Sequence, residues 1–88
     1  MKRTKFEDLT KEMFDTYKLK NEKYGDSFGK SIYKYGMIAT LTRISDKFNR
    51  FEQMVLNDNN GTPDESLRDT LLDMASYCVM TIVELEDK

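Results

Sequence analysis

Histidine and tryptophan are absent from this chain of 88 residues, and cysteine and proline occur once each. Without histidine, Ser-His and Cys-His mechanisms, conventional zinc sites and the commonest general base are excluded. Any hydrolysis would therefore depend on carboxylates and a hard metal ion. The single cysteine, Cys78, cannot form an intramolecular disulfide, and the apolar helical run around it predicts a buried, inert thiol.

Long apolar runs are also missing. No segment approaches the roughly 18 apolar residues of a membrane span, and residues 1–5 lead into alternating charges rather than an apolar signal region. The sequence therefore predicts a cytoplasmic protein with no membrane association. An apolar fraction of 39% and a charged fraction of 34% predict a folded chain, in which residues 1–88 form a single helical domain. The net charge of −2 argues against non-specific nucleic-acid binding.

Apolar residues recur at helical spacing and nowhere alternate with period two for long, so we expect an all-α fold with three long helices and a short one. The first helix is predicted over residues 1–20, where Thr4 and Glu7 can form a capping box. The other long helices are predicted over residues 37–56 and 62–86. A short helical piece over residues 32–35 should stop at Gly36. The remaining segment, residues 21–31, contains two glycines, an aspartate and serines, and is predicted to be a functional loop.

The last two long helices should form an antiparallel hairpin, because residues 57–61 (NDNNG) favour a sharp reversal. On the 37–56 helix, the predicted core face carries Leu41, Ile44, Phe48, Phe51 and Val55. On the 62–86 helix, the apolar arc is wider than one neighbouring helix needs. A second packing partner is expected there, so the hairpin is predicted to be completed into a bundle by homo-oligomerisation.

An acidic stripe marks the 62–86 helix. Glu65, Asp69 and Asp73 recur at i, i+4 and i+8, which places them along one side of the helix. One interpretation is a solvated face, since acidic residues near a helix N-terminus complement the macrodipole. The other is a divalent-cation site, because Asp73 lies beyond the reach of the dipole and like charges at i,i+4 repel.

A mixed cluster marks the 37–56 helix, where Asp46 is spaced for contacts with Arg43 and Arg50, and Lys47 lies beside it. Alone, the cluster is equally well interpreted as a surface ion-pair ladder. In an antiparallel hairpin, however, the acidic stripe runs back along these cations. Carboxylates suited to Mg²⁺ then lie close to bases suited to phosphate, as a nucleoside-phosphate site requires.

Three residues of the predicted loop have alternative roles. Tyr24 or Phe28 could stack on a nucleobase, or each could anchor the loop by hydrophobic contact, with the anchor favoured. Asp26 could bind a base or ribose edge or cap the next segment.

Three blocks resemble a small phage and bacterial family, the nucleotide modification associated domain, type one. They are Lys23 to Ser31 (KYGDSFGKS), Arg43 to Arg50 (RISDKFNR) and Asp64 to Tyr77 (DESLRDTLLDMASY), and the resemblance covers roughly residues 20 to 85. The family is named for its genomic association with nucleotide-modifying enzymes. The resemblance implies a nucleotide or nucleotide-derived partner, and the residues expected to bind it are Tyr24, Asp26, Lys30, Arg43, Lys47 and Arg50.

A more distant resemblance is to the MazG-like all-α nucleoside triphosphate pyrophosphatases, which hold Mg²⁺ with acidic motifs on two antiparallel helices. It implies Glu65, Asp69 and Asp73 as catalytic residues, with Mg²⁺ held by Asp46, Glu65, Asp69 and Asp73. The chain departs from that pattern where the superfamily has a Glu-rich block, because Arg43, Asp46, Lys47 and Arg50 stand there.

Three hypotheses follow from these patterns. The first is a Mg²⁺-dependent nucleoside triphosphate pyrophosphohydrolase of phage or bacterial nucleotide metabolism. The second is a non-catalytic phage protein that sequesters a nucleotide or nucleotide signal and blunts host defence, which the cationic helix and incomplete acidic set favour. The third is a helical protein-interaction module whose last helix docks a host helix.

Overall fold

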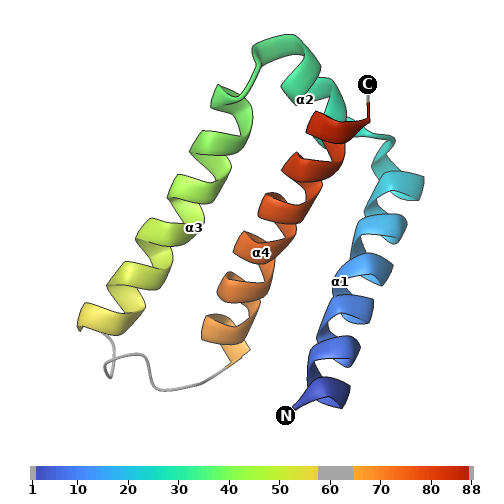
Figure 1. Ribbon diagram of the computed structural model, residues 1–88. Helices are drawn as coiled ribbons and strands as arrows, with labels where there is room; N and C mark the ends of the chain where they lie inside the picture. The colour runs from blue at the N-terminus through green and yellow to red at the C-terminus, as the bar shows by residue number, and fades with distance from the viewer. Residues whose placement is uncertain (1, 58–64, 88) are drawn as a thin grey trace.

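Four helices make up the part of the chain that the computed structural model describes, residues 2–57 and 65–87 (Figure 1). They are α1 (Arg3–Tyr24), α2 (Ser27–Tyr35), α3 (Ile38–Asn57) and α4 (Glu65–Glu86). The described residues contain no strand, so the all-α prediction is confirmed. Residues 62–64, where the last helix was predicted to begin, and most of the predicted 57–61 reversal lie outside the described residues.

The predicted functional loop is wrong over most of its length. Residues 21–24 continue α1, and α2 begins at Ser27, so only Gly25 and Asp26 separate the two helices. The capping interpretation of Asp26 is confirmed, because its Oδ1 accepts a hydrogen bond of 3.2 Å from the Gly29 backbone N–H. Gly25 adopts a φ of 70°, which a residue with a side chain rarely adopts. The sequence pattern underestimated α2 because a cap followed by glycine resembles a loop.

The other helix ends agree in part with the sequence. Helix α2 stops before Gly36 as predicted, since Gly36 has a φ of 74°. Helix α1, in contrast, begins at Arg3 and runs past Lys20. The predicted Thr4 cap is wrong, because the N-cap position is Lys2 and no side chain caps the helix.

Helices α3 and α4 are antiparallel, as predicted, and lie side by side, while α2 crosses between the upper ends of α1 and α3 (Figure 1). The buried residues at the centre of this hairpin are unusual, since three of them are the threonines Thr40, Thr70 and Thr81. The predicted core face of α3 is partly wrong: the side chains of Leu41 and Phe48 are 58% and 49% exposed. Helix α3 is turned so that Thr40, and not Leu41, faces α4.

The threonines are satisfied by hydrogen bonds. Thr81 Oγ1 donates its single proton to the Tyr77 carbonyl, one turn earlier, at 2.6 Å. Thr81 Oγ1 can therefore only accept from Thr40, so Thr40 Oγ1 is the donor in the 2.6 Å hydrogen bond that joins the two hydroxyls across the interface. This chain of hydroxyls allows two polar side chains to be buried without an unpaired donor. It also sets the register of α3 against α4, because the two residues must lie directly opposite each other.

We expect Thr81→Val to destabilise the protein more than Thr40→Val. Thr40→Val removes one hydrogen bond, which is worth about 1 kcal/mol, whereas Thr81→Val also deprives the buried Thr40 hydroxyl of its acceptor. Because about 1 kcal/mol lowers the melting temperature of a domain of this size by roughly 4–8 °C, thermal unfolding followed by circular dichroism resolves the difference. Equal losses in the two variants would contradict the assigned donor direction.

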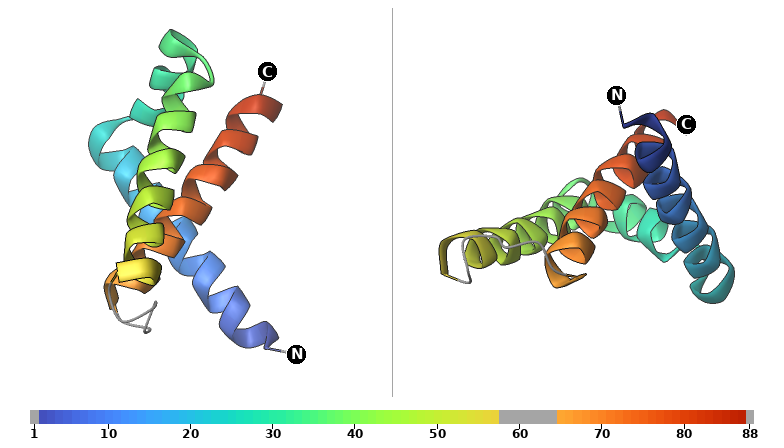
Figure 2. Two further views of the ribbon diagram at one scale, coloured as in Figure 1. Left: turned by 90° about the vertical axis from the view of Figure 1, so that its left-hand side faces the viewer. Right: turned by 90° about the horizontal axis from the view of Figure 1, so that it is seen from below.

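Helix α1 crosses α4 obliquely and extends beyond it (Figure 2). Near the crossing, both terminal nitrogens of Arg68 donate to the Glu12 carboxylate, at 2.7 and 3.0 Å. This hydrogen bonding lowers the pKa of Glu12 below its ordinary value. The two-point ion pair fastens α1 in the orientation that brings its last turns toward α3 and α4.

An apolar groove of about 440 Å³ lies between α1 and α4. It is lined mainly by Met13, Phe14, Val79, Met80 and Val83. Large apolar side chains remain exposed along both helices, among them Phe6 at 70%, Phe14 at 59% and Ile82 at 54%. Cys78 is also exposed, so the prediction of a buried thiol is wrong for the single chain. The apolar arc of α4 is therefore wider than α3 and α1 cover.

Candidate nucleotide-phosphate site

A cleft of about 440 Å³, lined by both polar and apolar groups, opens where the last turns of α1 approach α3 and α4. Helix α1 contributes Lys20 and Tyr24, and the start of α2 contributes Phe28. Helix α3 contributes Arg43 and Lys47, and α4 contributes Asp73, Ser76 and Tyr77. Side chains from all four helices therefore converge on one cleft. Three of the predicted substrate-binding residues, Tyr24, Arg43 and Lys47, line it.

Arg43 is the central cation of the cleft. Its guanidinium carbon lies 5.6 Å from the Phe28 ring centroid and 5.7 Å from the Tyr77 ring centroid. The two rings are 5.7 Å apart and tilted by 35°, so the guanidinium rests over the seam between them. Among the described residues, no carboxylate lies within ion-pair distance of Arg43. A partly buried arginine held by rings alone keeps its hydrogen-bond donors free for a ligand.

Lys47 and Asp73 are already paired. Lys47 Nζ lies 3.0 Å from Asp73 Oδ2, and the two side chains are 28% and 50% exposed. This bridge connects the predicted cationic and acidic helices, one turn of α3 away from Arg43. Lys47 therefore contributes little uncompensated charge to the cleft, and Asp73 faces an ammonium group.

The predicted magnesium ligands do not assemble in the described part of the chain. There, no group of three acidic side chains converges in a way that could hold a metal ion. Asp69 Oδ1 lies 3.9 Å from Arg68 Nη1, and the Asp69 side chain is 59% exposed. The side chain of Glu65 lies outside the description. A lysine beside Asp73 supplies the positive charge that a cation would otherwise supply, so the described carboxylates fit Mg²⁺ poorly.

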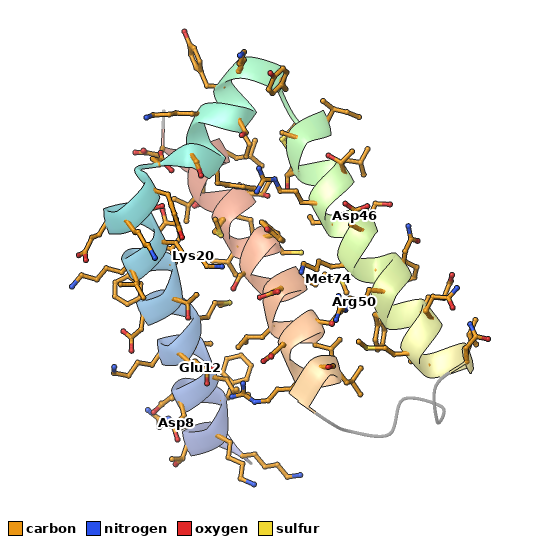
Figure 3. The ribbon with its side chains drawn as sticks, turned by 180° about the vertical axis from the view of Figure 1, so that it is seen from behind. Asp8, Glu12, Lys20, Asp46, Arg50 and Met74 are labelled. Carbon is orange, nitrogen blue, oxygen red and sulfur yellow. The ribbon has the colours of Figure 1, made fainter. Side chains whose placement is uncertain are left out.

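A shallower groove of about 410 Å³ lies between α3 and Tyr77. It is lined by Arg43, Asp46, Lys47, Arg50 and Tyr77. Figure 3 shows Asp46 and Arg50 one turn apart on α3, with Arg50 directed toward the Met74 region of α4. The ion pairs predicted from Asp46 to Arg43 and Arg50 do not form. Arg43, Lys47 and Tyr77 line both the groove and the cleft, so the two cavities adjoin.

Asp26 and Lys30, also predicted to bind substrate, line a different depression together with Gly29 and Glu84. A Cβ added at Gly29 would meet the Asp26 and Glu84 carboxylates, so those two side chains would have to shift to admit a larger residue. The structure therefore divides the six predicted binding residues among adjoining and separate surfaces. Tyr24, Arg43 and Lys47 share the cleft, Arg50 lies in the adjoining groove, and Asp26 and Lys30 lie apart.

Glu84 is held in an unfavourable charge environment. Burial raises the pKa of its carboxyl above the ordinary value, and the Asp26 and Asp87 carboxylates raise it further. Because the pKa is raised in the folded state, the ionised form opposes folding. That penalty is absent below the unfolded-state pKa of about 4.3 and is complete once the pH exceeds the raised value.

We therefore expect Glu84→Gln to increase the free energy of unfolding at pH 7 and to lose this advantage by about pH 3, where Glu84 is protonated in both states. Urea unfolding at the two pH values measures the difference. Glu86→Gln, on the exposed side of the same helix end, serves as the matched control and should change stability little. A Glu84→Gln protein that is less stable than the natural one at pH 7 would contradict this account.

Sequence reasoning missed Lys20 and Tyr77 as site residues and treated Phe28 mainly as an anchor. Lys20 precedes Tyr24 by one helical turn, and Tyr77 follows Asp73 by one turn, so each lies on the same helix face as a recognised site residue. This i,i+4 signal was present in the sequence. It could be used only once residues 21–24 were known to be helical.

Comparison with known protein families matches residues 20–85 to nucleotide modification associated domain 1. The chain belongs to this family. The family match includes all three sequence blocks and every residue of the cleft from Lys20 to Met80. The resemblance seen in the sequence is thereby confirmed, and a connection with nucleotides is supported at the level of the family's description. Searches of curated proteins and of solved structures found no match.

No described helix of this nucleotide modification associated domain is both long enough and apolar enough to cross a membrane.

Proposed function

We propose that this nucleotide modification associated domain binds a nucleotide through its phosphate groups, in the cleft between α1, α3 and α4, and retains it without cleavage. The observation that carries the proposal is Arg43, a partly buried guanidinium that lines the cleft and has no carboxylate partner among the described residues. Leaving a charge unpaired in a cleft is unfavourable unless a ligand compensates it. Phosphate oxygens are the acceptors that best match an arginine fork.

The rest of the cleft supports a nucleotide over free phosphate. Lys20 extends the cationic surface toward α1, and Asn21 and Ser76 add uncharged polar groups. Tyr24 lines the same space and remains 62% exposed, with Lys23 over its ring at 5.3 Å. An exposed ring next to a phosphate subsite can stack on a base. The family's association with nucleotide modification agrees with this ligand class.

Charge balance favours a nucleotide with few charges. Asp73 neutralises Lys47, so Arg43 and Lys20 are the uncompensated cations that line the cleft. Two positive charges match a nucleoside monophosphate or a ligand with two phosphodiester groups, including cyclic forms. A triphosphate carries about four negative charges and normally enters protein sites with Mg²⁺. The described acidic residues offer that ion no group of three ligands.

The consequence in a cell would be removal of a nucleotide or nucleotide signal from solution. A phage protein of this kind would blunt a host defence that depends on that signal. Hydrolysis by a MazG-like mechanism is the competing proposal, and it requires Lys47 to release Asp73 so that Asp69, Asp73, Asp46 and Glu65 could share Mg²⁺.

One experiment separates these proposals. The purified protein is incubated in the presence of Mg²⁺ with one nucleotide at a time, namely ATP, AMP, cyclic AMP or a cyclic dinucleotide. Bound and released species are then resolved by chromatography and mass spectrometry. Stoichiometric retention of an unchanged monophosphate or cyclic nucleotide supports sequestration. Turnover of ATP to AMP and pyrophosphate, abolished by Asp69→Asn, would overturn it in favour of the hydrolase. If the protein neither retains nor cleaves any of these nucleotides, the helical protein-interaction module becomes the favoured hypothesis.

We also propose that the working form is a homo-oligomer. The chain exposes 7051 Å² of surface, whereas a compact monomer of 10.4 kDa is expected to expose about 5,400 Å². In the described part of the chain, Phe28 and Leu67 are the only large apolar residues that are buried, at 4% and 9% exposure. The exposed apolar groove between α1 and α4 is the surface that self-association would cover.

A further inference from the structure

We infer that Phe28 and Tyr77 are positioning residues, which form an aromatic platform that fixes the Arg43 guanidinium for phosphate binding. The inference rests on the proposed function and assigns these two residues a role in it. The platform is the pair of rings from α2 and α4 on which the α3 arginine lies, with the three separations between 5.6 and 5.7 Å. Phe28 is 4% exposed, so its ring has little freedom to move.

The platform holds the cation without neutralising it. A carboxylate in the same place would orient Arg43 but would use its donors and cancel its charge, as Asp73 does for Lys47. Aromatic faces attract the guanidinium through the ring quadrupole and leave the N–H groups at its edge unbound. Arg43 can therefore be both ordered before the ligand arrives and fully available to it, which reduces the entropy lost on binding.

The geometry also favours an arginine over a lysine at this position. A flat guanidinium stacks on rings and presents a planar fork to two oxygens of one phosphate, whereas a lysine ammonium is a compact charge on a flexible stem. Because Phe28 belongs to α2, the platform depends on how α2 docks on α4. At this contact the Glu84 side chain of α4 reaches the α2 backbone at Gly29, and it would have to shift to admit a Cβ there.

The test is a double-mutant cycle with AMP as the probe, measured by calorimetric titration of the full chain. The variants are Tyr77→Leu, Tyr77→Phe, Arg43→Gln and the Tyr77→Leu/Arg43→Gln double variant. We expect Tyr77→Leu to weaken binding about fivefold and Tyr77→Phe to stay within about twofold of the natural protein. In the Arg43→Gln background, Tyr77→Leu should cause no further loss, because the ring acts through Arg43.

A second measurement needs no ligand. In proton NMR spectra, the Arg43 side-chain signals should be shifted upfield by the rings, retain that shift in Tyr77→Phe and lose much of it in Tyr77→Leu. The inference would be overturned if Tyr77→Leu bound the probe as tightly as the natural protein. It would also be overturned if Tyr77→Leu reduced the affinity equally in the natural protein and in the Arg43→Gln variant. A loss in Tyr77→Phe as large as in Tyr77→Leu would do the same, since the hydroxyl would then be the active group.

The two levels of the proposal fail differently. If the Arg43 signals show the ring shift but the natural protein binds neither AMP nor any other nucleotide of the panel, the proposed function and the ligand-positioning role both fall, and only the stacking geometry remains. If nucleotides bind and the ring shift is absent, the positioning role alone is overturned. Circular dichroism of Tyr77→Leu checks that its helices are intact.

Discussion

Arg43→Gln is expected to weaken nucleotide binding by one to two orders of magnitude while leaving the helical content unchanged. Hydrogen bonds to a charged group contribute about 1.5–3 kcal/mol, which corresponds to roughly a 10- to 100-fold change in affinity. Arg43 has no ion pair within the described chain, so its removal breaks no salt bridge of the fold. Calorimetric titration with the nucleotide retained in the panel experiment, together with circular dichroism, measures both parts of the expectation.

Two further arginine variants make this result specific. Arg3→Gln removes the same charge from α1, where Arg3 pairs with Glu7 and its side chain is 75% exposed, and it should bind nucleotide normally. Arg50→Gln alters only the adjoining groove, so we expect it to reduce nucleotide affinity less than Arg43→Gln does. If Arg43→Gln binds as tightly as Arg3→Gln, the cleft is not the phosphate site. If Arg50→Gln has the larger effect, the phosphate lies in the groove along α3.

Val79→Glu and Phe14→Glu are each expected to convert the proposed oligomer into monomers. Both residues line the apolar groove and are 46% and 59% exposed in the single chain, so a charge there is tolerated by the monomer. In an interface, the same carboxylate would be buried without a partner, which costs several kcal/mol. Size-exclusion chromatography with light scattering, at several protein concentrations, gives the mass of each species.

The matched control is Leu56→Glu. Leu56 is 68% exposed near the end of α3 and does not line the α1–α4 groove, so this variant makes the same chemical change away from the expected interface. It should keep the mass of the natural protein. A natural protein that runs as a monomer at every concentration would refute self-association. Dissociation by Leu56→Glu alone would move the interface to α3.

The elements of the fold were largely accessible from sequence, because helical periodicity and glycine are local signals. The stop at Gly36 and the antiparallel pairing of the last two helices were predicted correctly. Residues 21–31 were not, since Asp26 followed by Ser27 and Gly29 is compatible with a loop as well as with a capped helix. The structure distinguishes the two by the hydrogen bond from the Gly29 backbone N–H to Asp26 and by the burial of Phe28 in the next turn.

For the site, the sequence determined which residues were available: cations at Arg43 and Lys47, carboxylates along α4, and no histidine. Tertiary structure decided which of them act together. It paired Lys47 with Asp73, separated Asp26 and Lys30 from the cleft, and placed Arg43 on two rings from different helices. Spacing within one helix reports which side chains share a face. The distance between faces of different helices depends on how those helices pack, and that is set by the buried threonines, Phe28 and the Glu12–Arg68 pair.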